Sequence, residues 1–171
     1  TLFRSLTVND TVGGAAATHL KELDAKTSVV VDAKAVKTIT VPAGEDVADL
    51  ATVLAAKTIT LDTTAVAVTV DGKVSAADLN TIAKATGGVV TAEVEGSAAA
   101  LNAALKDVNS LDLITATLTG TSAKAKDLSE LAAKVSTVDA SGIESITGNA
   151  ADVKAALAIA SLVAGTVAVT V

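Results

Sequence analysis

The stretch Ile143–Leu157, IESITGNAADVKAAL, begins with a strand-like run and ends with a helix-like run. Its opening residues, Ile143–Ile146, are rich in β-branched side chains, which favour strands. A glycine then breaks the run, and Asn149 stands three residues before Asp152, a spacing typical of a capped helix start. Within Val153–Leu157 the apolar residues fall at helical spacing on one face. The stretch therefore predicts a strand, a turn and an amphipathic helix.

The same succession of strand-like run, turn and Ala-rich helical stretch occurs six times along the chain. The runs end near Val8, Val41, Val70, Val94, Leu118 and Ile146, and a seventh run, Thr166–Val171, closes the chain. Successive ends lie about 24 to 33 residues apart, a spacing typical of supersecondary units stacked in an array. The sequence thus predicts an array, and arrays usually build surfaces rather than active sites.

We expect a single repeat array over residues 1–171. Its six strand-helix units are predicted near 1–27, 28–57, 58–88, 89–109, 110–136 and 137–165, followed by a terminal strand over 166–171. Because the chain begins at Thr1 and not at Met, we also expect it to be processed or part of a longer chain. Second apolar stretches at Ser28–Val31 and Thr58–Leu61 indicate that a unit can hold two strands joined by a bend.

Three helical stretches share one apolar stripe at i, i+3, i+4 and i+7. The stripes are Leu101, Ala104, Leu105, Val108; Leu128, Leu131, Ala132, Val135; and Val153, Ala156, Leu157, Ala160. Helix starts are expected at Ser75 with Asp78, at Ser97 and at Asn149 with Asp152. Left-handed helix stops are expected at Gly87, Asn109 and Gly165.

Strands connected through helices of this length run parallel, with right-handed crossovers. The sequence therefore predicts an α/β fold of repeated strand-turn-helix units with parallel strands. The regular succession favours a solenoid-like arrangement, and a compact α/β layer is the alternative.

Composition narrows the range of functions. The 171 residues are 50% hydrophobic, enough for a substantial core without disulfides or metals. Phe3 is the single aromatic residue, and Cys, Met, Trp and Tyr are absent, which is unlike an ordinary enzyme. The missing sulfur favours an extracellular or cell-surface location. The net charge of −6 argues against nucleic-acid binding, and no apolar run approaches the roughly 20 residues of a membrane span.

The turn Ile146–Val153, followed by Lys154–Leu157, resembles the degenerate Ala/Thr/Val-rich repeats of very large cell-surface and secreted proteins of bacteria, marine cyanobacteria in particular. Similar turns stand near Leu118, Val94 and Val70, and the likeness weakens towards the N-terminus. The resemblance implies a structural or adhesive role outside the cell, with no inherited catalytic residues.

Catalytic and metal-binding patterns are weak. His19 is the one histidine, on a predicted helix, with no Cys to assist it and no motif to mark a Ser nucleophile. The pairs Gly13–Gly14 and Gly87–Gly88 fit no phosphate-binding fingerprint and are better interpreted as turn or helix-end residues. Asp139, Ser141 and Glu144 could ligate calcium if their loop curled around an ion, although ordinary turn formation is favoured. We expect no catalytic residues and, calcium aside, no cofactor.

Two surface hypotheses come from the strands. Thr-x-Thr pairs on a flat sheet face could order water or meet a surface such as ice or carbohydrate; the residues are Thr38, Thr40, Thr58, Thr60, Thr115 and Thr117. Thr is also simply a good strand residue. The uncharged run Thr166–Val171 has no proline or lysine to protect a sheet edge. We expect its valines, Val167, Val169 and Val171, to continue into neighbouring repeats or to dock on another protomer.

These observations together predict a non-enzymatic extracellular structural module that contributes to a surface layer, filament or fibre through self-association. The alternative is an adhesin or ice-binding module that displays a Thr-rich sheet face. An enzyme would need a polar cluster that the sequence spacing does not reveal.

Overall fold

The computed structural model describes residues 5–10 and 14–171. The chain forms two compact units, the first comprising Thr1–Gly72 and Thr81–Thr91 and the second Lys73–Asn80 and Ala92–Val171. The division runs through β6 (Ala67–Val74), α3 (Ala76–Ala85) and β7 (Val90–Gly96), so these elements contribute residues to both units.

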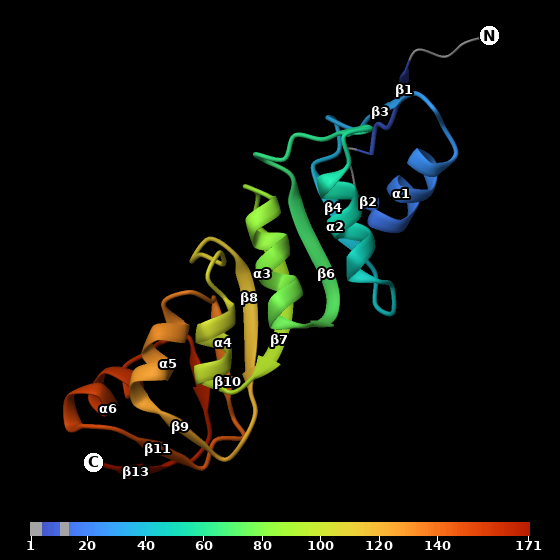
Figure 1. Cartoon of the computed structure of the whole chain (residues 1–171). Helices are drawn as coiled ribbons and strands as arrows, with labels where there is room; N and C mark the ends of the chain where they lie inside the picture. Colours follow the sequence, from blue (N-terminus) through green and yellow to red (C-terminus); the bar gives the residue numbers. More distant parts are fainter. Residues whose placement is uncertain (1–4, 11–13) are drawn as a thin grey trace. The chain divides into compact units, whose positions relative to one another are not determined.

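The first unit alternates pairs of strands with helices. Its further elements are β1 (Ser5–Thr7), β2 (Ala15–Ala16), α1 (Ala17–Ala25), β3 (Val30–Asp32), β4 (Thr38–Val41), α2 (Val47–Ala55) and β5 (Ile59–Thr60). The short strands form one parallel sheet in the order β1-β3-β5, and the other strands form a parallel ladder in the order β2-β4-β6. Helices α1 and α2 lie side by side (Figure 1). Each short strand comes before its ladder strand in the sequence.

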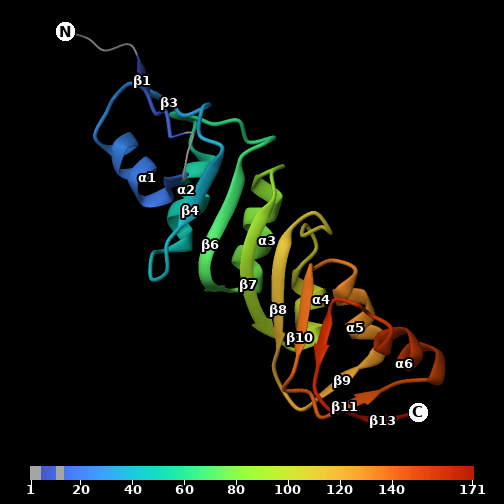
Figure 2. The same ribbon diagram turned by 180° about the vertical axis from the view of Figure 1, so that it is seen from behind.

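The second unit reverses that order, because its short strands come after the ladder strands. Its further elements are α4 (Ala98–Ala104), β8 (Leu113–Leu118), β9 (Ser122–Lys124), α5 (Ala125–Ala132), β10 (Thr137–Ala140), β11 (Ser145–Thr147), α6 (Ala150–Leu157), β12 (Leu162–Ala164) and β13 (Ala168–Thr170). The ladder runs β12-β10-β8-β7, and the short strands form a parallel sheet in the order β13-β11-β9. The helices α4, α5 and α6 pack in sequence order, as the view from behind also shows (Figure 2).

The predicted α/β class with parallel strands is confirmed. The described residues contain six helices, and each of the six predicted unit ranges holds one of them. The layered α/β alternative fits this arrangement. The expectation of a single continuous array stays a prediction.

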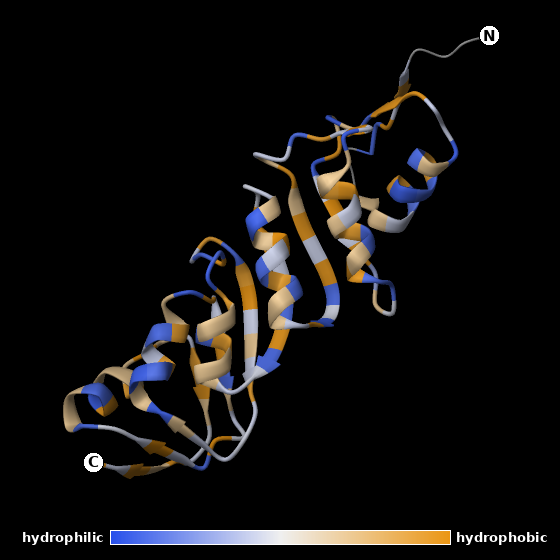
Figure 3. Cartoon of the chain, in the orientation of Figure 1, coloured by the Kyte–Doolittle hydropathy of each residue, from blue (hydrophilic) through white to orange (hydrophobic). Residues whose placement is uncertain are grey.

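The core of each unit is built by alternation along the strands. In the first unit the register pairs Ile39 with Val68 and Val41 with Val70, and all four are buried. In the second unit Ala116 pairs with Val138 in the same way. The apolar and polar bands along β6 show this period of two (Figure 3). Helices add one buried stripe each, such as Leu128 and Leu131 of α5.

Polar side chains tie several helices to a neighbouring coil of the chain, where a coil is one strand-helix repeat. In the first unit Lys21 of α1 forms an ion pair with Asp49 of α2, and this contact raises the pKa of Lys21. In the second unit the Asn102 amide of α4 donates to the backbone carbonyl of Asp127 at 2.7 Å. The Lys134 amine, after α5, donates back to the backbone carbonyl of Asn102 at 2.8 Å. Such contacts recur at a spacing of 25 to 32 residues.

The three predicted helix starts are confirmed. Ser75 accepts a hydrogen bond from the Asp78 amide at 3.1 Å, Ser97 accepts from the Ala100 amide at 3.2 Å, and the Asn149 side chain accepts from the Asp152 amide at 2.9 Å. In each case the side chain satisfies one first-turn N–H that has no partner inside the helix.

The predicted left-handed helix stops at Gly87, Asn109 and Gly165 are wrong. Among the described residues, positive φ angles occur at glycines only, and these are Gly14, Gly44, Gly72 and Gly120. Gly87 and Gly88 are required because the neighbouring backbone leaves no room for a side chain at either position. A Cβ on Gly88 would lie 2.2 Å from the Val66 carbonyl oxygen, and one on Gly87 would lie 2.8 Å from that of Thr64. Gly13 lies outside the described residues.

All three predicted stripes extend past the ends of their helices; Val135, for example, is buried beyond the end of α5 at Ala132. Leu105 and Val108 are buried, but α4 ends at Ala104, so they pack from the following loop. Leu157 is 52% exposed and Ala160 is also exposed, because the described residues hold no later helix to cover the end of α6. Helical spacing identifies a stripe but does not tell how far the neighbouring elements extend over it.

Candidate functional site

The terminal strand β13 has one hydrogen-bonded edge. Its register sets Ala168 beside Ser145 and Val169 beside Ile146 of β11. The Ala168 amide donates to the Glu144 carbonyl at 2.8 Å, and the Gly148 amide donates to the Thr170 carbonyl at 3.2 Å. In a parallel pair, alternate residues direct both backbone groups to the same neighbour. Ala168 and Thr170 are therefore committed to β11.

The backbone groups of Val167, Val169 and Val171 consequently face away from β11. In the described residues no strand pairs with this outer edge, because β13 is an end strand of its sheet. Val169 is 45% exposed and Val171 is 78% exposed, while Val167 is half-buried. The three valines named from the sequence are thus the residues with unpaired, outward-facing backbone on this strand.

This edge is free of charge. From Ala155 to Val171 the chain holds no Asp, Glu, Lys, Arg or His, whereas the whole chain has a net charge of −6. Natural sheet edges are usually protected by lysine, proline or a covering element. The edge of β13 has none of these among the described residues, so its surface is suited to further strand pairing.

The threonines of the ladder strands lie partly exposed, alternating with the buried core residues. In the first unit Thr40 of β4 stands beside Thr69 of β6 in the register. In the second unit Thr115 of β8 stands beside Thr137 of β10, while Thr117 stands beside Asp139. Thr69 and Thr137 belong to no Thr-x-Thr pair, so the sequence pattern does not mark them.

Thr58 and Thr60 lie elsewhere in the first unit. Thr60 belongs to β5 of the short-strand sheet, where the register sets it beside Asp32. The Thr58 hydroxyl donates to Asp24 at 2.8 Å and so takes part in a contact between coils. The six predicted threonines therefore do not share one sheet face: the ladder strands carry Thr38 and Thr40 in the first unit and Thr115 and Thr117 in the second.

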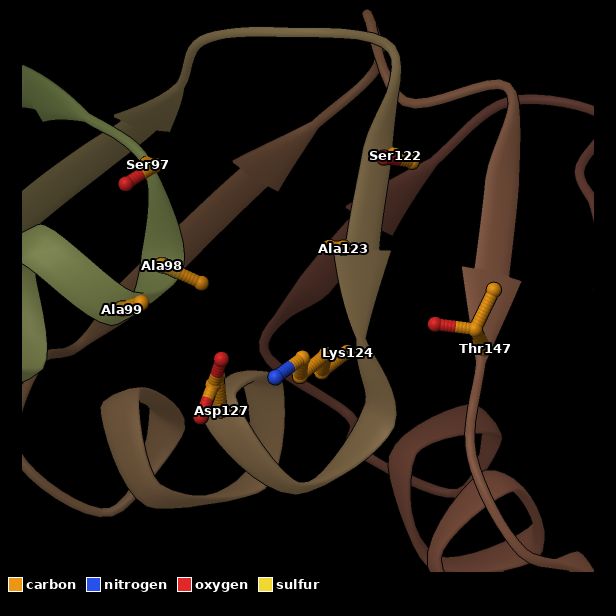
Figure 4. A pocket seen from close by; sticks show the side chains of 8 residues that line it. All are labelled: Ser97, Ala98, Ala99, Ser122, Ala123, Lys124, Asp127 and Thr147. Atoms are coloured by element: carbon orange, nitrogen blue, oxygen red, sulfur yellow. The ribbon is translucent and has the colours of Figure 1, made fainter.

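A hollow of about 260 Å³ opens in the second unit between the start of α4 and β9 (Figure 4). Its lining consists of Ser97, Ala98, Ala99, Ser122, Ala123, Lys124, Asp127 and Thr147. Figure 4 shows the Lys124 amine and the Asp127 carboxylate at the same side of the hollow. These residues come from three successive coils, so no local sequence pattern marks the hollow.

The hollow offers hydrogen bonding but no activated nucleophile. The Ser97 hydroxyl already caps α4, and no histidine lines the hollow. Nucleophilic catalysis by Ser requires a general base within hydrogen-bond reach, and the lining includes one carboxylate, Asp127, and one amine, Lys124. We find no catalytic constellation in this arrangement.

The residues considered for other chemistry are separate from the hollow. His19 is exposed on α1. Asp139 accepts a hydrogen bond from the Ser141 amide at 3.0 Å, and the Ser141 hydroxyl and amide together lower the pKa of Asp139. Residues 5–10 and 14–171 hold no group of three or more His, Cys, Asp or Glu side chains placed to bind a metal ion. The helices in that part of the chain are too short, or not apolar enough, to cross a bilayer.

No protein-family model, curated protein or solved structure matches the chain.

Proposed function

We propose that this protein is a non-enzymatic extracellular structural module that contributes to a cell-surface layer, filament or fibre through self-association. The observation that carries the proposal is the outer edge of β13, where Val167, Val169 and Val171 direct unpaired backbone groups away from the sheet. An unprotected, uncharged strand edge is a template for pairing with another chain.

Side-chain contacts recur between successive coils, and they support a solenoid-like array. In such an array β13 would be an end strand with its outer edge open to a partner. Lys21 contacts Asp49 at a spacing of 28 residues, and Asn80 contacts Asp107 at a spacing of 27. In repeat proteins each unit is stabilised mainly by its sequence neighbours, and end repeats need a polar cap to stay soluble. The uncharged edge of β13 is the opposite of such a cap.

The remaining parts of the proposal rest on composition and on the chemistry of the hollow. A chain without Cys or Met offers few side chains to oxidise, as suits a long-lived extracellular material. The hollow beside β9 combines Lys124 and Asp127 with hydroxyl groups but without an activated nucleophile. These features favour a role in structure over catalysis.

Sedimentation velocity over a wide range of protein concentration, with negative-stain electron microscopy at the highest, tests the proposal. We expect oligomers or ordered polymers in the absence of any ligand. A chain that stays monomeric at millimolar concentration would exclude the structural role.

A second candidate is an adhesin or ice-binding module, favoured by the register pairs Thr40–Thr69 and Thr115–Thr137 on the ladder strands. Replacement of Thr38 and Thr40 by Val keeps the β-branched shape and removes the hydroxyls. Ice binding predicts that thermal hysteresis is lost in this variant. The matched control replaces Thr58 and Thr60 by Val on the separate sheet and should keep the hysteresis. An absence of hysteresis in the unmodified chain excludes ice binding.

A further inference from the structure

The outer edge of β13 is nearly self-complementary in its sequence. Around Val169 the residues read Val167, Ala168, Val169, Thr170, Val171, so valines stand at equal distances on both sides of the centre. The residues with free backbone groups, Val167, Val169 and Val171, have the same symmetry. This symmetry distinguishes a second copy of the chain from an unrelated extended peptide as the partner.

We propose that Val167–Val171 pairs antiparallel with the same strand of a second copy, across a two-fold axis that passes midway between the two Val169 residues. The inference rests on the self-association proposed above and specifies its partner and register. Val169 faces Val169 of the second copy, and Val167 faces Val171. Each such pair exchanges two N–H···O bonds, as in the hydrogen-bonded pairs of an antiparallel ladder.

Other antiparallel registers pair fewer of the three outward-facing valines with one another. A shift that sets Val169 opposite Ala168 fails, because the backbone of Ala168 is already bonded to β11. A shift that centres the axis on Ala168 sets Val171 opposite Gly165, which lies beyond the bend at Thr166. The register centred on Val169 is the one that engages all three valines with one another. Two-fold contacts of this isologous kind are the commonest in homo-oligomers.

The side chains also suit the contact. Val169 lies in the same row as the buried Ile146, so it belongs to the core-facing side of the sheet. Val167 and Val171 share that side because side chains alternate along a strand. A two-fold axis normal to the sheet brings the valine sides of both copies together. Since Ala155–Val171 carries no charge, the contact sets no like charges against each other in a chain of net charge −6.

Val169→Lys tests the contact, with Val163→Lys as its matched control. Val163 of β12 is 53% exposed, similar to Val169 at 45%. The Val138 amide of β10 donates to the Ser161 carbonyl at 3.0 Å, so Ser161 directs its backbone to β10. Val163, two residues later, directs its backbone the same way. Its side chain lies beside that of Asp139. We expect Val169→Lys, which places two ammonium groups at the axis, to raise the dissociation constant at least tenfold in sedimentation equilibrium. Val163→Lys should associate like the unmodified chain.

A cysteine variant tests the register and does not depend on tolerance of a lysine. The chain has no Cys, so Val169→Cys and Val163→Cys each carry a single thiol. Hydrogen-bonded residues of an antiparallel pair have Cα atoms about 5.5 Å apart, a separation that a short bis-maleimide cross-linker spans. With this reagent we expect a covalent dimer of Val169→Cys and none of Val163→Cys.

The outcomes separate the inference from the proposed function. If the unmodified chain associates while Val169→Lys associates equally well and Val169→Cys forms no covalent dimer, the contact lies elsewhere; the inference is then overturned and self-association stands. If the unmodified chain stays monomeric at every concentration, both are overturned. Equal cross-linking at positions 163 and 169 would also overturn the inference, because it indicates random collision.

Discussion

The side-chain oxygen of Asn80 accepts hydrogen bonds from the backbone amides of both Lys106 and Asp107, each at 2.7 Å. The amide nitrogen of the same side chain donates to the Asp107 carboxylate at 2.8 Å. One residue of α3 therefore holds the loop between α4 and β8 in place. Asn102 of α4 acts in a similar way one coil later, on the carbonyl of Asp127.

Asn80→Ala should destabilise the second unit by about 1 to 3 kcal/mol, since a net contribution of about 0.5 to 1.5 kcal/mol is typical of each hydrogen bond. Water can reach these exposed groups, which keeps the loss moderate. Lys84→Ala, an exposed change on the same helix, is the control and should cost less than about 0.5 kcal/mol. Urea unfolding of both variants gives the comparison; equal losses would show that Asn80 does not tie the coils.

Leu128→Ala and Leu157→Ala should differ sharply in the stability they lose, although the sequence places both leucines on core-facing stripes. Leu128 of α5 is fully buried, whereas Leu157 at the end of α6 is 52% exposed. We expect a loss of about 3 to 5 kcal/mol at Leu128, where a cavity forms, and less than about 1 kcal/mol at Leu157. Thermal and urea unfolding at low protein concentration, where association is absent, measure both. Similar losses would contradict the burial of α5 and the exposure of α6.

The helices and most of the strands could be predicted because their signals are local. Caps such as Asn149 and the apolar stripe around Leu128 depend on residues a few positions apart. The sequence does not predict β2, β9, β10 or β12, because short strands of two to four residues, such as Ser122–Lys124, carry too few positions for a period of two to show. Their pairing is decided by neighbouring coils, which no local pattern describes.

Of the candidate site, too, one part could be predicted from local sequence and one part could not. The outward edge valines could be named from the sequence because the strand Ala168–Thr170 and its lack of charge are local features. The hollow beside β9 could not, because Ser97, Lys124 and Thr147 meet only when three coils are folded. The predicted helix stop at Gly87 failed for a related reason: the glycine is required by its neighbour Thr64, not by its own backbone conformation.

Gly88→Ala should destabilise the first unit by about 1 to 3 kcal/mol or more, the usual range for a forced steric overlap. The added Cβ would lie 2.2 Å from the Val66 carbonyl oxygen, which also accepts a hydrogen bond from the Thr86 hydroxyl. Backbone must therefore move, and a packed hydrogen bond is disturbed with it.

Gly142→Ala is the control for that change. A Cβ at Gly142 meets no atom within 4 Å, and its φ is not in the left-handed region. We expect this variant to be neutral or up to about 1 kcal/mol more stable, because Ala restricts the unfolded chain. Calorimetry distinguishes the two glycines, and a neutral Gly88→Ala would show that the strand start near Val66 adapts freely.

Asp139 should give the second unit a pH-dependent contribution to stability. Hydrogen bonds from the Ser141 hydroxyl and amide lower the pKa of Asp139 below its ordinary value of 3.8. A lowered pKa in the folded state means that the stabilisation is present above pH 3.8 and is lost as the pH falls through the folded pKa. Ser141→Ala removes the hydroxyl, the larger cause, and keeps the amide, so the pKa should move part of the way back. Carboxyl NMR titration of both proteins measures this directly; an Asp139 pKa that does not respond to Ser141→Ala would assign the shift to another group and remove Ser141 from the pH dependence of unfolding.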